Sequence, residues 1–481
     1  MNSETRELKN SRTVVVRFAP SPTGFLHIGG LRTALYNYLF ARHNNGKFLL
    51  RIEDTDKTRY VEGAVEKLLE ILNWCGLEYD EEPVIQSQRL DIYKCYIDNL
   101  LERRYAYRCF CTPERLEKSR KIQIARKQTP KYDGLCRKIP QIESDKLSEE
   151  KPFTVRMKIP LEEIKFTDII RGEIKFDGAL IDDQIILKSD GYPTYHLANV
   201  VDDHLMGITH IIRGEEWLSS TPKHILLYRY FGWTAPQVAH LPLLLNPDKS
   251  KLSKRQSDVA VEDYRDKGYL PDALLNYVAL LGWSTEDSQQ LFERAELIQK
   301  FSLERCGKSA AIFDTQKLLW MNGEYIRKMS VAHLAKCATE FLERKGVSIT
   351  DSEFFQKCIA LEQKKFNTLN DILQRVDFLL NDEYNTDTDA VKKILGIQGI
   401  SGLIKELKEK IIQIKVYDAQ ELENLFRSFA DEKKIKTSII FHAIRVATSG
   451  RLEGPSLFHY LELLGKEKVV NRIAKFLERC H

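Results

Sequence analysis

Apolar runs and helical repeats alternate near the start of the chain. Three consecutive valines lie in the stretch from Thr13 to Phe18, which predicts a strand buried on both faces. After an Asn-Asn-Gly turn, the stretch from Lys47 to Ile52 predicts a second strand. Between the two strands, apolar residues recur at the spacing of a helix face: Leu31, Ala34, Leu35, Tyr38 and Leu39. This order predicts two parallel strands joined by a crossover helix.

The same alternation returns after residue 195. The stretches His210–Ile212 and Val238–Leu241 predict two more strands, and Pro222–Phe231 predicts a helix between them. Residues 85–195 interrupt the alternation and contain a hairpin-like stretch over Glu173–Ile186. We therefore predict an α/β fold, in which a Rossmann-type parallel sheet for nucleotide binding is split by an inserted α+β domain.

The pattern becomes helical beyond about residue 325. Between residues 331 and 481 the chain has one proline, Pro455. Two sets of apolar residues mark helix faces: Leu403, Leu407 and Ile411, then Leu422, Leu425 and Phe429. The C-terminal region is therefore predicted to be all-α.

Composition and charge narrow the class of protein. The 481 residues are 43% hydrophobic, which supports large cores and roughly three domains. A polar start, apolar runs shorter than the ~18 residues of a membrane span, and nine scattered cysteines predict a cytoplasmic protein with reduced thiols. Residues 391–481 hold 17 Lys/Arg against 11 Asp/Glu, which suits contact with nucleic acid. Taken alone, that charge fits a solvated helical surface better.

Polar segments follow the ends of three predicted strands. These segments are the Pro/Gly loop after Phe18, Glu53–Asp56 and Arg213–Trp217. In an open parallel sheet, ligands bind at the carboxyl ends of the strands. We therefore expect the three segments to share one rim.

The Pro/Gly loop has features that suit phosphate. Its last residues, Gly29 and Gly30, open the predicted helix, and helix N-terminal amides beside bare glycines can approach a phosphate closely. His27 can donate to a phosphate oxygen. A short His-x-Gly is more often a turn with a satisfied histidine, but the string PSPTGFLHIGG is far more specific. A second loop holds Lys251 and Lys254, whose mobile charges suit a triphosphate, although such a loop alone is usually solvated.

These two loops resemble the signature motifs of class I aminoacyl-tRNA synthetases. Residues 27–30 resemble the HIGH motif and residues 251–255 the KMSKS motif, with Gly30 in place of the second histidine. The chain is more closely similar to the bacterial glutamyl-tRNA synthetase family, whose members resemble it at Gly30. The stretches that match are 17–24 (RFAPSPTG), 51–56 (RIEDTD), 192–199 (YPTYHLAN), 213–217 (RGEEW) and 454–467.

The resemblance implies a two-step reaction. L-glutamate is activated by ATP with Mg²⁺ to glutamyl-adenylate, and the glutamyl group then passes to the terminal adenosine of tRNA-Glu. Positioning and charge stabilisation suffice for such steps, so no protein nucleophile is expected. The resemblance also implies a monomer.

The resemblance assigns residues to each role. The catalytic residues it implies are His27, Lys251 and Lys254. For ATP it implies Thr23, His27, Gly29, Gly30, Lys251 and Lys254. For glutamate it implies Arg17, Ser21, Glu53, Tyr195, Asn199 and Arg213, with the two arginines on the side-chain carboxylate and Glu53 on the ammonium.

The resemblance also predicts a division into domains. Residues 1–84 and 196–247 form the two halves of the catalytic domain, and residues 85–195 an inserted domain that binds the acceptor end of tRNA. Residues 248–325 form a stem-contact domain with the KMSKS-like loop. Residues 326–390 and 391–481 form two helical anticodon-binding domains.

Three cysteines raise the question of zinc. Cys109, Cys111 and Cys136 are spaced as in members of the family that bind zinc. In those members the fourth ligand falls two residues after the third cysteine, where this chain has Lys138, which is not a zinc ligand. We therefore expect free thiols and no metal, although three thiolates with a distant partner or water could still hold zinc.

Alternative functions remain open at this point. A non-discriminating enzyme would also charge tRNA-Gln with glutamate. A truncated relative that modifies a tRNA base lacks a C-terminal domain, and the helical region beyond 325 argues against it. A catalytically inactive tRNA-binding protein is opposed by the intact motif residues.

Overall fold

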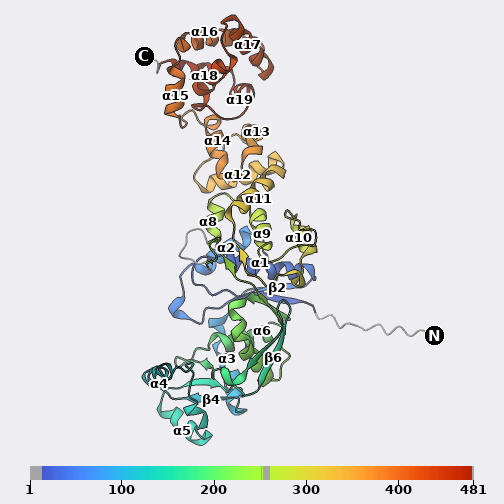
Figure 1. The fold of residues 1–481 in the computed structure, drawn as a ribbon, viewed down its shortest axis with the longest axis vertical. Coiled ribbons are helices and arrows are strands. Elements are labelled where there is room, and N and C mark those ends of the chain that lie inside the picture. Colours follow the sequence, from blue (N-terminus) through green and yellow to red (C-terminus); the bar gives the residue numbers. More distant parts are fainter. Residues whose placement is uncertain (1–12, 251, 253–259, 479–481) are drawn as a thin grey trace, which may run out of the picture. The chain divides into compact units, whose positions relative to one another are not determined.

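The computed structural model describes residues 13–250, 252 and 260–478, and the chain divides into two compact units (Figure 1). Unit 1 contains Met1–Asp263 and Leu274–Asp314. Unit 2 contains Tyr264–Ala273 and Thr315–His481. Each unit is therefore built from two separate stretches of the chain.

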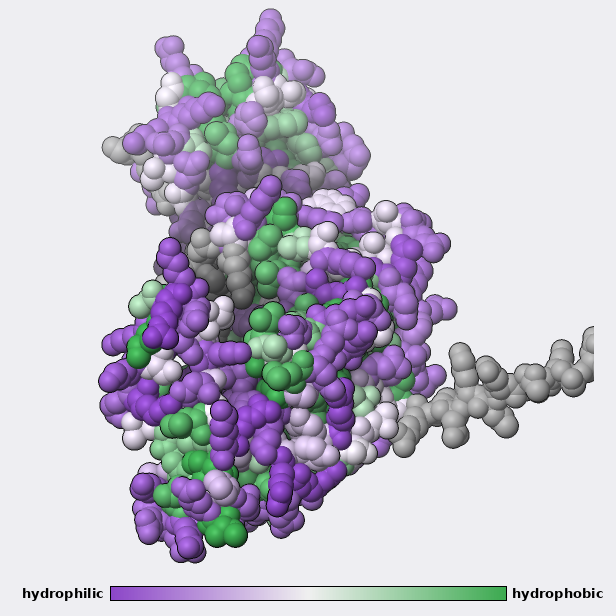
Figure 2. Space-filling view, turned by 60° about the horizontal axis from the view of Figure 1, so that its bottom comes forward, coloured by the Kyte–Doolittle hydropathy of each residue, from purple (hydrophilic) through white to green (hydrophobic). Residues whose placement is uncertain are grey.

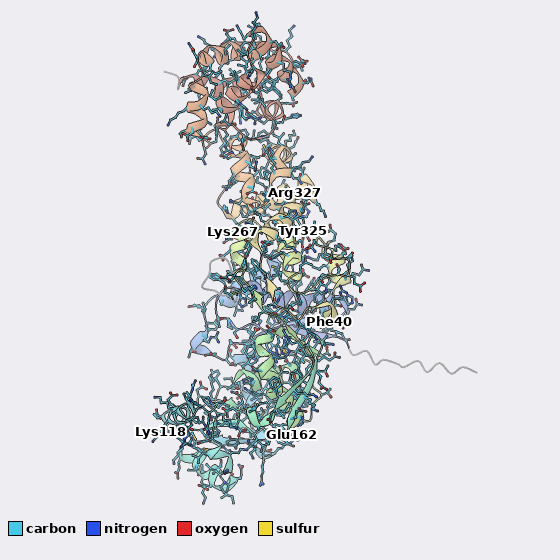
Figure 3. The ribbon with its side chains drawn as sticks, viewed as in Figure 1. Phe40, Lys118, Glu162, Lys267, Tyr325 and Arg327 are labelled. Atoms are coloured by element: carbon cyan, nitrogen blue, oxygen red, sulfur yellow. The ribbon has the colours of Figure 1, made fainter. Side chains whose placement is uncertain are left out.

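The first sheet of unit 1 has the order β1–β2–β3, and its strands run parallel. Its strands are β1 (Val15–Phe18), β2 (Lys47–Ile52) and β3 (Val84–Ile85). Two helices connect them, α1 (Ile28–His43) and α2 (Ala64–Trp74). The α1 helix is buried on most of its sides, and Phe40, labelled in Figure 3, lies with its ring 4.9 Å from that of His210. The predicted strand–helix–strand unit is confirmed.

The second sheet of unit 1 has the order β7–β6–β10–β9. Its strands are β6 (Glu163–Asp168), β7 (Gly172–Asp177), β9 (His210–Gly214) and β10 (Gln237–Leu241). The helix α7 (Thr221–Phe231) connects β9 to β10, and β10 runs parallel to both β9 and β6. The amide of Thr209 donates to the carbonyl of Val15 at 2.9 Å, which places β9 beside β1. The late parallel strands are thus confirmed.

The predicted hairpin over Glu173–Ile186 is wrong. The hairpin of this region pairs β6 with β7, and Gly172, at φ 85°, begins β7 directly after the turn. The strand β8 (Ile185–Leu187) pairs instead with β5. Alternating apolar residues predict strands in this region, but they do not determine which strands pair.

A third, antiparallel sheet has the order β4–β5–β8. Its other strands are β4 (Ala106–Cys109) and β5 (Thr154–Met157). Two helices, α3 (Leu90–Glu102) and α6 (Tyr195–Leu205), bury Leu100 and Leu197 in one core with Val155 of this sheet. The helices α4 (Pro113–Ala125) and α5 (Gln141–Glu150) are largely exposed.

The rest of unit 1 pairs β11 (Leu244–Leu245) with β12 (Ala311–Ile312) and contains α10 (Arg294–Lys300). Along the chain, α8 (Val261–Asp266) and α9 (Pro271–Ala279) contain the points at which the sequence passes from one unit to the other.

Unit 2 is helical, as predicted. Its helices are α11 (Thr315–Lys328), α12 (Val331–Arg344), α13 (Ser352–Glu362), α14 (Asn370–Leu380), α15 (Thr388–Leu395), α16 (Ile400–Gln413), α17 (Ala419–Glu432), α18 (Thr437–Ser449), α19 (Leu457–Leu464) and α20 (Lys466–Glu478). Ser330, Asp351 and Asp418 cap three of them by accepting backbone amides. Leu407 and Phe429, from the two predicted apolar faces, are buried in one core.

Among the described residues, no helix is long and apolar enough to cross a membrane. Figure 2 shows a face on which hydrophilic side chains predominate and apolar side chains form smaller patches.

Candidate active site

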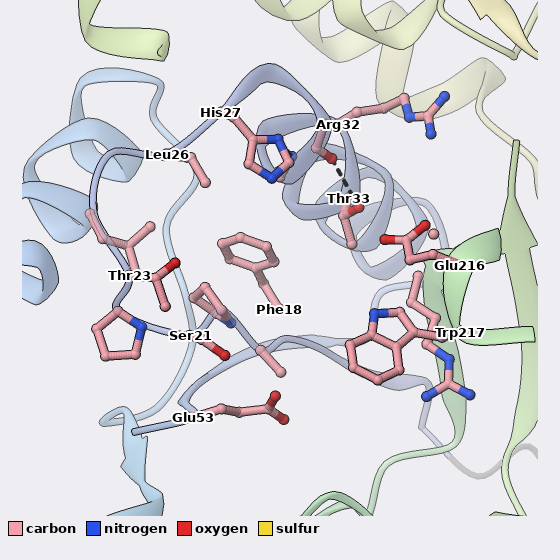
Figure 4. A pocket seen from close by; sticks show the side chains of 18 of the residues that line it. Phe18, Ser21, Thr23, Leu26, His27, Arg32, Thr33, Glu53, Glu216 and Trp217 are labelled. Atoms are coloured by element: carbon pink, nitrogen blue, oxygen red, sulfur yellow. Dashed lines mark hydrogen bonds between the residues drawn. The ribbon is translucent and has the colours of Figure 1, made fainter. Parts of the chain in front are cut away.

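A cavity of about 740 Å³ opens in unit 1 at the carboxyl ends of the parallel strands (Figure 4). The loop after β1, the end of β2 and the end of β9 all line it, so the three strand-end segments share one rim as expected. The predicted residues that line it are Arg17, Ser21, Thr23, His27, Gly29, Gly30, Glu53, Tyr195 and Arg213. Three further residues that line it, Arg32, Glu216 and Trp217, were given no site role from the sequence.

His27 begins the helix α1. Its Nδ1 accepts a hydrogen bond from the amide of Gly30 at 3.1 Å, so the neutral ring carries its proton on Nε2. A Cβ atom at Gly29 would lie 3.0 Å from the His27 ring, and one at Gly30 would lie 2.7 Å from Leu26 Cδ1. The two glycines therefore make room for neighbouring side chains of the chain itself.

Arg17 is buried and faces a carboxylate. Its Nε donates to Asp203 Oδ1 at 2.9 Å and its Nη2 to Asn199 Oδ1 at 3.3 Å. Asn199 is fully buried, is not among the residues that line the cavity, and has no partner for its Nδ2 among the described residues. The structure therefore brings Asn199 to Arg17 rather than to the cavity wall.

Arg51 completes this cluster, and sequence reasoning missed it. It is fully buried, and it donates to Asp203 at 2.6 Å, to Asn199 at 2.8 Å and to Glu53 at 3.0 Å. Burial opposes the charged form of Asp203, but Arg17 and Arg51 outweigh it and lower its pKa. Burial raises the pKa of Glu53, although Arg51 acts in the opposite direction. Asn199 and Asp203 are four residues apart on the buried face of α6, a spacing that could have indicated this polar cluster.

Arg213 comes from the end of β9 and is also buried. Its Nη1 donates to the Tyr195 hydroxyl at 3.1 Å and its Nη2 to the Thr221 hydroxyl at 2.9 Å. Two histidines from α7 and β10, His224 and His240, also contact its guanidinium. Sequence reasoning missed both, because neither lies in a recognised motif.

Tyr195 and Trp217 form an aromatic wall beside Arg213. Their ring centroids lie 4.1 Å apart, and burial raises the pKa of Tyr195, so its hydroxyl stays protonated. Glu216 projects toward the cavity on the same side, in Figure 4 beside Trp217. A Cβ atom at Gly214 would lie 2.2 Å from the Glu216 carboxylate, so a larger residue there would displace that side chain.

Two predicted catalytic residues, Lys251 and Lys254, lie outside the described residues. Leu252 is described and lines the cavity, and its amide donates to the carbonyl of Leu244 at 3.1 Å.

Cys109, Cys111 and Cys136 form a separate cluster whose sulfur atoms all lie within 4.8 Å of one another. Cys111 Sγ and Cys136 Sγ are 3.6 Å apart, close to the roughly 3.8 Å edge of a tetrahedron with Zn–S bonds of about 2.3 Å. The hydroxyl of Tyr132 lies 3.5 Å from both Cys109 Sγ and Cys111 Sγ. The cluster can therefore hold a metal ion. Two nitrogens lie slightly nearer to the thiols than the Tyr132 hydroxyl does, Arg115 Nη1 at 3.3 Å from Cys111 Sγ and the amide of Phe110 at 3.4 Å from Cys136 Sγ, and both donate hydrogen bonds to them.

Comparisons with known proteins agree with this architecture. The family described as "tRNA synthetases class I (E and Q), catalytic domain" matches residues 13–320, and the "Anticodon binding domain" matches residues 333–477. A glutamate–tRNA ligase of Chloroherpeton thalassium is 46% identical over 98% of this chain and 99% of its own length. One of Clostridioides difficile is 46% identical over 96% of this chain and 98% of its own.

Solved structures give the same result. The crystal structure of a glutamate tRNA ligase from Elizabethkingia meningosepticum, in complex with its amino acid, is similar with a TM-score of 0.88 and 38% identity. The alignment covers 98% of this chain and 100% of that one. Since the catalytic family covers more than half of the chain and the relatives nearly all of it, the chain belongs to the class I tRNA synthetases of the glutamate and glutamine branch.

Proposed function

We propose that this chain is a glutamate–tRNA ligase, which activates L-glutamate with ATP and transfers the glutamyl group to tRNA-Glu. Its relatives of that activity support the reaction. The choice of amino acid depends on one observation, a cavity that places two buried guanidiniums near a largely buried carboxylate. L-glutamate has two carboxylates and one ammonium, so its charges are complementary to this set.

The amino acid lies between the ends of β1, β2 and β9. Arg213 and Arg17 bind its side-chain carboxylate, and the Tyr195 hydroxyl donates to the same group. Glu53 binds the ammonium, and Ser21 lies beside it on the rim. Asn199 acts through Arg17, whose guanidinium it orients.

ATP lies over the start of α1, with Mg²⁺ as its counterion. Thr23, Gly29 and Gly30 border the phosphates, and His27 donates through Nε2 because its Nδ1 accepts from Gly30. Lys251 and Lys254 neutralise the departing pyrophosphate.

The two steps need no protein nucleophile. An oxygen of the α-carboxylate attacks the α-phosphorus, and the bond from that phosphorus to the bridging oxygen of pyrophosphate breaks. A ribose hydroxyl of the terminal adenosine then attacks the carbonyl carbon of the adenylate, and AMP leaves. Donors held in place before the reaction stabilise the charge that develops in each step.

The domain roles are part of the proposal. Residues 85–195 bind the acceptor end, residues 248–325 contact the stem, and residues 326–390 and 391–481 bind the anticodon. The family match over residues 333–477 supports the last of these roles. We propose a monomer in solution.

The thiol cluster would take a structural metal. Zinc there would be held by Cys109, Cys111 and Cys136 and would tie β4 to the short helix η3 (Leu135–Lys138). Metal analysis of the purified full-length protein tests whether the thiol cluster holds zinc. About one zinc per chain, lost when Cys136 is changed to Ser, contradicts our expectation of free thiols from the missing fourth ligand.

Charging assays test the proposed function. Purified tRNA-Glu and tRNA-Gln are each incubated with labelled glutamate, ATP and the enzyme. Charging of tRNA-Glu alone is the expected result. Charging of both would establish a non-discriminating enzyme, and charging of neither would overturn the proposal in favour of an inactive tRNA-binding protein.

A further inference from the structure

We infer that His240 and His224 are positioning residues, which aim the Arg213 guanidinium into the amino-acid cavity by accepting hydrogen bonds as neutral rings. This inference rests on the proposed function, because it assigns the remaining donor of Arg213 to the side-chain carboxylate of glutamate. It gives a role in the site to two residues, His240 and His224, that do not touch the substrate.

Arg213 differs from its neighbours Arg17 and Arg51 in its partners. Arg17 and Arg51 both contact Asp203, whereas Arg213 forms no ion pair with a carboxylate among the described residues. Its partners are two hydroxyls and two imidazoles. A buried guanidinium without a counterion is costly, so this cation is set to receive an anion from the cavity.

The donors of Arg213 can be counted. Its Nε–H points to His240 Nε2 at 3.2 Å, and its Nη2 group points to the Thr221 hydroxyl at 2.9 Å and to His224 Nδ1 at 3.3 Å. One of the two Nη1 hydrogens goes to Tyr195. A guanidinium has five N–H groups, so one Nη1–H is left for a ligand. The Tyr195 hydroxyl hydrogen has no acceptor among the described residues either, so two donors converge where a carboxylate can accept both.

Asp168 fixes the tautomer of His240. The fully buried His240 Nδ1 lies 2.6 Å from Asp168 Oδ2, so Nδ1 carries the proton and Nε2 is left as an acceptor for Arg213. Burial opposes ionisation of Asp168, but hydrogen bonds from His240 and from the amides of Arg171 and Ile170 lower its pKa. If His240 were protonated, its Nε2–H would face the Nε–H of Arg213, and this hydrogen bond could not form.

His196 fixes the tautomer of His224, which is opposite to that of His240. His224 Nε2 lies 3.0 Å from His196 Nδ1, while its own Nδ1 faces Arg213. The ring therefore accepts at Nδ1 and donates at Nε2. Burial and the charge of Arg213 lower the pKa of His224 well below its ordinary value, which keeps the ring neutral.

The two rings present different nitrogens to Arg213, and this difference supplies the test. A glutamine amide can place its oxygen near the Nε2 position of a histidine, and an asparagine amide near the Nδ1 position. We therefore expect a crossed pattern: His240→Gln and His224→Asn keep the acceptor, whereas His240→Asn and His224→Gln lose it. If only side-chain size mattered, the glutamine variant would bind glutamate better than the asparagine variant at both positions.

The assay is glutamate-dependent exchange of pyrophosphate into ATP in the presence of tRNA-Glu, with KM measured for both small substrates. We expect His240→Asn and His224→Gln to raise KM for glutamate about 10- to 100-fold, the loss typical of a hydrogen bond to a charged group, with KM for ATP unchanged. His210→Gln, on the same strand as Arg213 but outside its contacts, is the matched control.

The inference would be overturned if the glutamine variant had the lower KM for glutamate at both positions. It would also be overturned if the KM for glutamate and the KM for ATP rose equally. The same holds if all four variants behave as the wild type. The two positions are independent, so an unfolded variant at one still leaves the comparison at the other. A wild-type protein without glutamate-dependent exchange would instead overturn the proposed function.

Discussion

Asp203 faces two buried guanidiniums, that of Arg17, which lines the cavity, and that of Arg51. Two like charges can be buried so close together only because a carboxylate lies between them. This buried cluster is therefore stable only as long as this one anion is present.

Replacing Asp203 with Asn should destabilise unit 1 by about 3–5 kcal/mol, because two charges lose their shared partner. Four of the five tryptophans, Trp74, Trp217, Trp233 and Trp283, lie in unit 1, so in a Trp320→Phe background thermal unfolding followed by tryptophan fluorescence reports on it. Glu81→Gln breaks only an exposed pair with Lys47 and should cost at most about 1 kcal/mol. Equal shifts in the two variants would refute this account.

His196 should make stability depend on pH. Burial lowers its pKa from 6.5 to about 4 in the folded protein. Between these values the unfolded chain binds a proton that the folded chain does not, so stability falls as pH drops from 6.5 toward 4 and is fully present above 6.5. His196→Gln should flatten this part of the profile. Unfolding in urea at pH 7, 5.5 and 4.5 checks it, and an unchanged slope would contradict it.

Several elements follow directly from local pattern. Three valines and a helical repeat predict β1 and α1, and the bounds of β2 agree with the predicted stretch from Lys47 to Ile52. The pairing of β6 with β7 did not follow, because alternation fixes which side chains are buried and leaves the partner strand open.

The site shows the same limit. Residues at strand ends, such as Glu53 and Arg213, could be placed at the cavity because parallel strands end on one edge. The contact of Arg51 with Asp203 joins residues 152 positions apart, and no local pattern predicts it. The same applies to Asp168 and His240, which are 72 positions apart.

One helix offers a test of backbone conformation. In α16, Gly402 has open space where a Cβ would lie, whereas Gly399, just before the helix, has φ 77°. Gly402→Ala should stabilise unit 2 by about 0.5 kcal/mol, because it restricts the unfolded chain without strain. Gly399→Ala should destabilise it by about 1 kcal/mol, because a side chain disfavours this conformation. Urea unfolding followed by circular dichroism compares them, and the same sign for both would be evidence against this explanation.

At the scale of the whole molecule, the chain passes from unit 1 to unit 2 and back before it finally enters unit 2. The stretch Tyr264–Ala273 belongs to unit 2, although unit 1 residues flank it on both sides. Leu270 is buried in the core of unit 2, and its amide donates to Asn322 Oδ1 at 2.8 Å. A fragment that begins at residue 315 would therefore lack part of its own core.

Leu270→Ala should destabilise unit 2 by about 2–5 kcal/mol, since it removes a buried side chain. Unfolding followed by the helical circular dichroism signal should shift, while the tryptophan transition of unit 1 should not. The exposed Val416, also in unit 2, provides the control, because its change to Ala should have little effect. A shift confined to the tryptophan signal would place Leu270 in the wrong unit.

The position of Tyr264–Ala273 in the sequence also sets an order of events during synthesis. A ribosome makes Tyr264–Ala273 before it makes Ala311 and Ile312, which complete the last strand of unit 1. The apolar side chains of that segment therefore leave the ribosome before any of the helices that will cover them. At about 5–20 residues per second, the rest of the chain takes roughly ten to forty seconds to follow. Unit 1 is complete once Asp314 has been made, but Leu270 and Ala273 still have no finished core to enter, so the nascent chain presents apolar side chains that chaperones can bind.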